Sequence, residues 1–469
     1  MRLTLSGFTK KKKGQTMSLV SSLSVQKRSL NINTSLIRPD APETKFTVLI
    51  GRNGSGKSRL LNAYVSLSSY GEDDRRNRTR FDSPSSANSA GKYPVDDLRI
   101  IAYSNSPTDN FRATNRKRTK KTRGAEYFYI GTKSKSFRQN LSTLIGDIAI
   151  SLKKDQTKQN QYGQLLKDLG FEPRIFLRLS SKILKVVATK YTISTKQYEK
   201  FNGAELLNIL LEENTQIKFN PRQKESVIKF LDKIKYDWNA EKLDFEYELD
   251  FDNLFKSNDL SENLEAILAL KKNKILSVSD IVAFKYGNQY GFDLSGSSSG
   301  ESVMLYFFFG LIYRLQEKSV ILIDEPEASL HPNWQTEYID ILKKIVAPYS
   351  EYQCIIATHS PQIVANCPQE ETTVLRLQQI DGTIHTSYVP PEDSGWSVES
   401  ILYNVFGCRE AGNKYFERDL SKILNLISNK STDKKEVIRI IGSLKRLKLK
   451  LDDPVNLIIK KAEEYEAQI

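Results

Sequence analysis

One short stretch of the chain combines glycines with a lysine and a serine at a fixed spacing. Residues 51–58 read GRNGSGKS, which fits the pattern GxxxxGK[ST], and they follow the apolar run Phe46–Ile50. Glycines in such a turn let backbone N–H groups surround phosphate oxygens at a helix N-terminus. We therefore expect Lys57 to reach the outer phosphates of a nucleotide and Ser58 to place its hydroxyl on Mg²⁺. The predicted nucleotide contacts in this loop are Asn53, Gly54, Ser55, Gly56, Lys57 and Ser58.

Two acidic residues follow another apolar run, Val320–Ile323. Asp324, at the end of this predicted strand, is placed to hold the Mg²⁺ shell together with Ser58. Glu325 comes one residue later and is placed to polarise an attacking water. The acid pair would supply the Mg²⁺ ligand and the base that a phosphate-binding loop needs for hydrolysis. We therefore predict Glu325 and Lys57 as catalytic residues.

Two further segments can contact phosphate groups. Residues 295–301 read SGSSSGE and directly precede an apolar, helix-like run. Serine and glycine at a helix start offer free N–H groups and hydroxyls, so Ser299 can cap this helix and Gly300 allows close approach. Farther along, His359 follows the apolar run Cys354–Ala357. We predict that His359 provides an additional hydrogen-bonding group for a γ-phosphate.

The four segments GRNGSGKS, SSSGE, ILIDEPEASLHP and ATHS occur in this order. They resemble the Walker A, signature, Walker B with D-loop, and switch-histidine motifs of ABC-type ATPases. The resemblance implies ATP and Mg²⁺ as cofactors and a homodimer or higher homo-oligomer. It also implies that Ser298, Ser299, Gly300 and Glu301 of one subunit contact the nucleotide that another subunit holds. ABC-type ATPases usually have a glutamine that couples one lobe of the head to the Mg²⁺ site. That glutamine is not evident in this sequence, and Asn105 lies near its expected place.

A mixed sheet with helices must position these motifs, so the expected fold class is α/β. Runs that are apolar on both faces, such as 46–50, 320–323 and 354–357, suit buried parallel strands. Apolar residues spaced three and four apart predict a helical insertion, and the tail from Val398 is expected to be helical throughout. We predict four domains: residues 1–136 with the first motif and basic loops, 137–240 the helical insertion, 241–395 with the other motifs, and 396–469 the helical C-terminal region.

Residues 243–252 alternate strictly between apolar and acidic side chains, which predicts a strand with two unlike faces. The acidic face is interpreted as a solvated surface or one turned to a basic partner, with a metal site as the alternative.

Composition excludes several classes of protein. The chain has 469 residues, 39% of them hydrophobic, which is too long for one small module and too apolar for a disordered chain. The longest apolar run, residues 303–313, is shorter than the roughly 20 residues of a membrane-spanning helix. With no signal-peptide pattern at residue 1, a cytoplasmic location without membrane contact is expected. Three cysteines without CxxC spacing and only three histidines exclude a disulfide framework and a His-rich metal centre.

The net charge of +14 is concentrated in one region. Residues 75–123 hold thirteen Lys and Arg residues against four Asp residues. Such basic loops suit DNA, an acidic protein partner or an acidic phage protein, and a solvated loop without a ligand is the alternative.

The segments DEPEASLHP and ATHSPQIV resemble the corresponding motifs of the overcoming-lysogenization-defect and RecF-like branch of the ABC-type ATPases. Nucleases of that branch add a Toprim domain with a Glu and a DxD pair. Here the helical tail contains Asp452-Asp453 instead, so no nuclease centre is expected in this chain. The segments IIAYSNSPTDNF and EYFYIG look most like the ATPase subunits of Septu anti-phage systems, whose partner is a separate HNH nuclease.

This resemblance implies an ATPase subunit of an anti-phage complex that controls a separate nuclease. An HNH nuclease is the first expectation, and a Toprim nuclease, as in PARIS systems, is the second. Two alternatives stay open. One is a RecF-like DNA-repair ATPase, and the other is a nucleotide-sensing scaffold with negligible turnover.

Overall fold

The structure is a computed structural model, and it describes only part of the chain. The described residues are 2–6, 22–27, 30–35, 44–69, 98–106, 109, 111, 126–131, 144, 148, 155–180, 202–213, 217–237, 244–253, 265–267, 269–294, 300–380, 383–391, 395–407, 413–447, 449 and 453–469.

The chain folds into two compact units. Residues 1–129 and 316–469 form the first unit, and residues 130–315 form the second. The first unit contains the glycine-rich loop, the acid pair and His359, and the second contains the start of the helix after the SSSGE motif. The predicted domain limits at 136, 240 and 395 differ from these divisions and stay a prediction.

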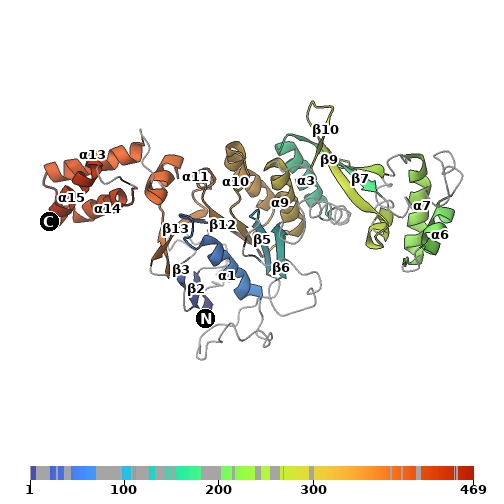
Figure 1. Ribbon diagram of the computed structural model, residues 1–469, viewed down its shortest axis with the longest axis horizontal. Helices are drawn as coiled ribbons and strands as arrows, with labels where there is room; N and C mark the ends of the chain where they lie inside the picture. The colour runs from blue at the N-terminus through green and yellow to red at the C-terminus, as the bar shows by residue number, and fades with distance from the viewer. Residues whose placement is uncertain are drawn as a thin grey trace. The chain divides into compact units, whose positions relative to one another are not determined.

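A ten-stranded sheet is the centre of the first unit (Figure 1). In sheet order its strands are β1 (Arg2–Ser6), β2 (Ser22–Lys27), β3 (Leu30–Ser35), β14 (Thr383–Tyr388), β13 (Thr372–Ile380), β4 (Phe46–Ile50), β12 (Tyr352–Thr358), β11 (Ser319–Asp324), β5 (Arg99–Ser104) and β6 (Glu126–Gly131).

The middle of this sheet is parallel from β13 to β5, whereas β13 and β14 form an antiparallel hairpin. Every residue of β4, β11 and β12 is buried, as expected for strands covered on both faces. In the register of the sheet Ile50 lies opposite Thr358, and Ala357 lies opposite Asp324. The carboxyl ends of the strands before the predicted motifs therefore meet at one edge.

Helices cover the sheet of the first unit. Helix α1 (Lys57–Ser69) lies against β11 and β12, and its Leu60, Leu61 and Tyr64 belong to the buried core (Figure 1). Two more helices are α10 (Pro332–Val346), which His331 caps, and α11 (Pro361–Ala365), which Ser360 caps.

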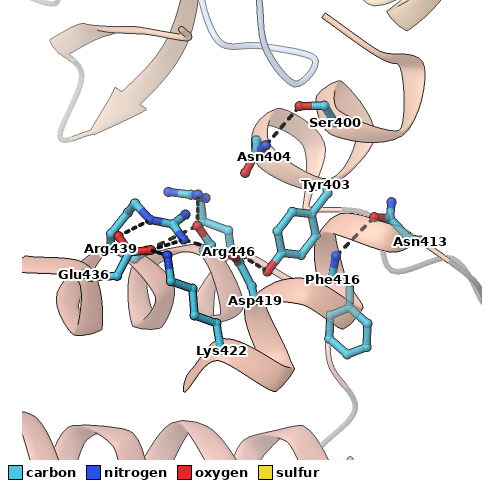
Figure 2. Close-up of polar contacts among 11 residues, drawn as sticks. Ser400, Tyr403, Asn404, Asn413, Phe416, Asp419, Lys422, Glu436, Arg439 and Arg446 are labelled. Atoms are coloured by element: carbon cyan, nitrogen blue, oxygen red, sulfur yellow. Dashed lines mark hydrogen bonds and ion pairs between the residues drawn. The ribbon is translucent and has the colours of Figure 1, made fainter. Parts of the chain in front are cut away.

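The C-terminal residues form a separate helical core within the first unit. Its elements are α12 (Val398–Ile401), the π-helix η4 (Leu402–Phe406), α13 (Lys414–Ser428), α14 (Lys434–Lys445) and α15 (Pro454–Glu466). Beside this apolar core, Asp419 on α13 accepts hydrogen bonds from the Tyr403 hydroxyl at 3.2 Å and from Arg439 at 2.9 Å (Figure 2). The tail from Val398 is helical, as predicted.

The second unit contains a four-stranded antiparallel sheet in the order β10, β9, β7, β8. Its elements are α3 (Gln156–Asp168), β7 (Phe171–Ser180), α6 (Gly203–Glu213), α7 (Pro221–Asp237), β8 (Asp244–Asp250), β9 (Ser277–Lys285), β10 (Gly291–Asp293) and α9 (Gly300–Arg314). Helix α9 is buried over most of its length, as predicted. Tyr162 of α3 contacts Phe309 of α9, with ring centroids 5.1 Å apart.

The predicted helical insertion at 137–240 contains α3, α6 and α7, and it also contains a strand, β7, that the helical periodicity did not predict. Ile175, Leu177 and Leu179 are buried at every second position, and this period of two is the pattern of a strand. Strand β7 pairs with β8 and β9, which lie outside the segment, so partners distant in sequence decide its conformation.

Candidate nucleotide-binding site

The glycine-rich loop connects β4 to α1, and two of its glycines have positive φ angles. Gly54 has φ +79° and Gly56 has φ +98°, a region that other residues rarely adopt. A Cβ atom on Gly56 would also lie 2.1 Å from Cδ1 of Ile384. These positions therefore require glycine, which lets the loop turn its backbone around a small anion.

Lys57 is the first residue of α1, and only 4% of it is exposed. Its Nζ donates to the carbonyl oxygens of Gly51 at 2.9 Å and Arg52 at 3.3 Å, and it lies 2.8 Å from Nε2 of His359. Burial lowers the pKa of Lys57 to about 8, against the opposing effect of nearby carboxylates, of which Glu325 contributes most.

His359 follows β12 and faces both Lys57 and Glu325. Burial, and then the charge of Lys57, lower the pKa of the imidazole, so it is neutral at pH 7. Nε2 lies 2.8 Å from Lys57 Nζ and 3.4 Å from Oε1 of Glu325. Because one neutral nitrogen cannot both accept and donate, the shorter contact assigns Nε2 as the acceptor from Lys57.

The predicted Mg²⁺ ligands contact each other. Ser58 Oγ donates to Oδ1 of Asp324 at 2.9 Å. Burial raises the pKa of Asp324 to about 7, with a further contribution from Glu325, while the Ser58 hydrogen bond opposes the shift. A hydroxyl and a buried carboxylate are hard oxygen ligands that suit Mg²⁺, whose charge would favour the ionised carboxylate. Ser55 Oγ, buried in the loop without a hydrogen-bond partner, likewise suits a phosphate oxygen.

Glu325 begins a tight turn after β11. Its φ is +51°, its N–H donates to Ala357 O at 2.8 Å, and its carbonyl oxygen accepts from the N–H of Ala328. The side chain is 37% exposed, which leaves the carboxylate accessible to water. Of the predicted catalytic residues, the structure thus brings Lys57, Glu325 and His359 together.

Glu327 was not predicted as a site residue, although it lies within the segment ILIDEPEASLHP. Its buried carboxylate accepts from Thr358 Oγ1 at 2.8 Å and from the backbone N–H of His359. Burial raises the pKa of Glu327, and the hydrogen bonds from the His359 segment oppose that shift. The sequence signal was the third acid of DEPE, but its partners lie 31 and 32 residues away.

Other predicted site residues lie elsewhere or outside the described chain. Asn105 donates to Ala328 O at 2.8 Å, in the turn after Glu325, and its place beside Mg²⁺ stays a prediction. Asn53 is exposed in the glycine-rich loop. Ser298 and Ser299 are outside the described residues. Gly300 and Glu301 begin α9 in the second unit, where Glu301 pairs with Lys285 at 2.8 Å.

Most of the basic segment 75–123 lies outside the described residues. Arg99 is described, and its Nε donates to Glu126 at 3.0 Å, so it is a strand residue with an acidic partner.

Within the described ranges no helix is long and apolar enough to cross a membrane, and no three acidic, His or Cys side chains form a metal-binding group. Asp252 of the alternating acidic strand region pairs with Lys167 at 2.9 Å.

The chain matches one family of proteins and is similar to several known proteins. Residues 46–365 match the family described as "AAA domain, putative AbiEii toxin, Type IV TA system". The Septu protein PtuA of Bacillus mycoides (strain KBAB4) is 23% identical over 457 residues, covering 94% of this chain and 51% of that protein. The Septu protein PtuA of Bacillus thuringiensis is 28% identical over 181 residues, covering 35% of this chain and 43% of that protein. The chain thus spans about half the length of the curated relatives it matches.

Among solved structures, the chain is similar to a Smc head domain with an extended coiled coil from Pyrococcus furiosus, bound to the C-terminal domain of ScpA. The identity is 16%, the TM-score is 0.22, and the match covers 53% of this chain and 57% of that one.

Proposed function

Because the chain belongs to the AAA-domain family described as putative AbiEii toxins of type IV toxin–antitoxin systems, we propose that it is the ATPase subunit of an anti-phage defence assembly. ATP binding and hydrolysis by this chain then control a separate partner nuclease. The observation that carries the proposal is the meeting of Lys57, the Ser58–Asp324 pair, Glu325 and His359 at one edge of the sheet. The Septu name of two relatives supports the defence role.

In this proposal each residue has a defined task. The loop N–H groups and Lys57 bind the phosphates, and Ser58 with Asp324 holds Mg²⁺, which neutralises phosphate charge. Glu325 accepts a proton from the attacking water, because its partly exposed carboxylate is accessible to that water. His359 stays neutral beside Lys57 and offers an N–H to the terminal phosphate. Glu327 positions His359 by holding its backbone N–H.

The assembly is proposed to be a homodimer or a higher homo-oligomer in the cytoplasm. Ser298, Ser299, Gly300 and Glu301 of one subunit would complete the nucleotide site of another. The partner nuclease is proposed to be of the HNH type, with a Toprim nuclease second, and the basic segment 75–123 is a proposed contact for nucleic acid.

The catalytic proposal is tested by measuring ATP binding and phosphate release in parallel. Glu325→Gln should keep ATP binding and lower turnover by about a hundredfold or more, the usual range for a lost general base. Lys57→Ala should weaken ATP binding itself. The matched control is Glu337→Gln, an exposed residue on α10. Unchanged phosphate release in Glu325→Gln would remove Glu325 from the role of base, and ATP binding without turnover in the unmodified chain would favour the nucleotide-sensing scaffold.

The partner proposal is tested by co-purifying the chain with the product of the adjacent gene. An HNH or Toprim nuclease that elutes with the chain supports the proposal. A chain that stays alone, next to a gene unrelated to nucleases, contradicts it. The RecF-like alternative instead predicts ATP-dependent DNA affinity that falls steeply with salt concentration.

A further inference from the structure

Three arginines from distant parts of the first unit converge on the helical turn η4 and Gly407. Arg52 of the glycine-rich loop donates to Phe406 O at 3.0 Å and to Arg446 O at 3.3 Å. Arg376 of β13 donates to Asn404 O at 3.2 Å. Arg446 follows α14, and its guanidinium donates to Ser443 Oγ at 2.8 Å. The hydrogen-bond acceptors of all three guanidinium groups are thus neutral oxygens.

No carboxylate among the described residues forms an ion pair with any of these three arginines. The Nε atoms of Arg376 and Arg446 are buried and have no hydrogen-bond partner. Burial lowers the pKa of Arg376 to about 10, and the charges of Arg446 and Arg52 lower it further. Burial also lowers the pKa of Arg446, and Tyr403 and Asp419 offset that shift only in part. Holding like charges close together at partly buried positions is unfavourable, so the cluster has unused capacity for an anion.

A fourth arginine of the same helical region shows the ordinary arrangement. Arg439 pairs with Asp419 at 2.9 Å and with Glu436 at 2.8 Å, and Lys422 adds a further pair to Glu436 (Figure 2). Each of these four charged residues has a partner of opposite charge. The helical region thus neutralises Arg439 with direct ion pairs, whereas Arg446, the residue that caps the end of α14, forms no ion pair with a described carboxylate.

We propose that Arg52, Arg376 and Arg446 form an anion subsite for a phosphate-class oxyanion. Guanidinium groups offer several N–H donors in a plane and bind phosphate oxygens in pairs. Arg376 lies opposite Ile50 in the sheet, directly beside the strand end from which the glycine-rich loop begins. Since Arg52 belongs to that loop, an anion held by all three arginines connects the loop to the C-terminal helices.

The phosphate group can come from two sources. One is a nucleotide bound in the glycine-rich loop, and this source rests on the proposed function. The other is free inorganic phosphate, which does not require nucleotide binding. The Lys57→Ala background separates the two, because it disables the loop and leaves all three arginines in place.

The test measures binding of inorganic phosphate by calorimetry to the unmodified full chain and to Lys57→Ala. We expect phosphate binding to persist in Lys57→Ala, because the three arginines remain in place there. In the Lys57→Ala background, Arg376→Gln and Arg446→Gln should each weaken phosphate binding by about tenfold or more, the effect of one lost charge-assisted hydrogen bond. Arg418→Gln, an exposed arginine on α13, is the matched control and should leave the affinity unchanged.

A second arm measures ATP affinity with Lys57 intact. Weaker ATP binding in Arg376→Gln assigns the anion to the nucleotide, and unchanged ATP binding with weakened phosphate binding assigns it to free phosphate. Either result supports the subsite. If the unmodified chain shows no ATP binding but the arginine-dependent phosphate binding persists, the proposed function fails and the subsite stands.

Melting temperatures in phosphate-free and phosphate-containing buffer keep the proposal testable if a variant folds poorly. Phosphate should raise the melting temperature of the unmodified chain and should have little effect on Arg446→Gln. An arginine that only makes structural hydrogen bonds would lower the melting temperature equally in both buffers. That result, or the absence of phosphate binding to the unmodified chain, would overturn the subsite.

Discussion

Lys57 is a buried cation whose protonation must depend on its surroundings. Its pKa falls from 10.5 to about 8, because burial disfavours the charged form more than the nearby carboxylates favour it. Between pH 8 and 10.5 the unfolded chain holds this proton and the folded chain has lost it, so folding stability rises with pH in that window. Below pH 8 both states are protonated, and the burial cost is fully present.

We therefore predict a pH-dependent difference between the nucleotide-free chain and Lys57→Met. From pH 8 to 10.5, the unmodified chain should gain stability relative to the variant by on the order of 3 kcal/mol. Denaturant unfolding of both proteins across this range measures the difference. Parallel stability curves would show that Lys57 has an ordinary pKa in the folded chain.

We expect Glu327 to act on the site through His359, because its carboxylate accepts the backbone N–H of that residue. Its two carboxylate oxygens accept from separate donors, Thr358 Oγ1 and the His359 N–H. In Glu327→Gln an amide NH₂ must face one of these donors, at a cost of about 1–3 kcal/mol. We predict a lower kcat, by about tenfold or more, with an unchanged KM for ATP.

Steady-state phosphate release over a range of ATP concentrations separates kcat from KM for this variant. Thr358→Val removes one of the two donors and should have a smaller effect, and Glu337→Gln should have none. If Glu327→Gln lowers stability but leaves kcat unchanged, Glu327 only supports the fold.

At the scale of elements, replacing two different glycines by alanine should change the stability of the fold in opposite directions. Gly56 has a positive φ and lacks space for a Cβ, whereas a Cβ on Gly442 in α14 would meet nothing within 4 Å. Gly56→Ala should destabilise the fold by about 1–3 kcal/mol through backbone strain. Gly442→Ala should stabilise it by about 0.5–1 kcal/mol, because alanine is the better helix former.

Thermal unfolding of both alanine variants beside the unmodified chain tests this pair. Loss of stability in both would mean that Gly442 packs against a neighbour in solution. A neutral Gly56→Ala would mean that the glycine-rich loop relaxes away from Ile384 when no ligand is bound.

At the scale of the whole molecule, the proposed assembly predicts complementation between two inactive chains. Lys57→Ala disables the glycine-rich loop, and Ser299→Ala disables the signature segment. If sites form between subunits of a symmetric dimer, a mixed dimer contains one intact site and one site with both changes. Mixing the two variants should therefore restore ATP turnover to about a quarter of the unmodified level.

Turnover of each variant alone gives the baseline, and refolding or co-expression forms the mixed dimers. The Lys57→Ala chain mixed with a Lys57→Ala, Ser299→Ala double variant is the control and should stay inactive. No recovery in the first mixture would contradict nucleotide sites shared between subunits.

Local patterns by themselves predicted much of this protein. The order of the four motifs predicted an ABC-type ATPase, and the segments IIAYSNSPTDNF and EYFYIG predicted a likeness to Septu proteins. The family match and the curated relatives confirm both. Apolar runs predicted β4, β11 and β12, the buried helix α9 and the helical tail, all of which the structure contains. These features were predictable because neighbouring residues determine a buried strand, a helix or a glycine turn.

Only the tertiary structure decided which distant residues meet. Strand β7 was missed because its partners β8 and β9 lie in a later segment, and pairing with them outweighs the helical pattern around it. Glu327 and the three arginines were missed because an acid or a guanidinium acquires its role from partners, some more than 300 residues away. Spacing along the chain encodes the local phosphate loop, whereas burial and charge pairing depend on every element that packs around a side chain.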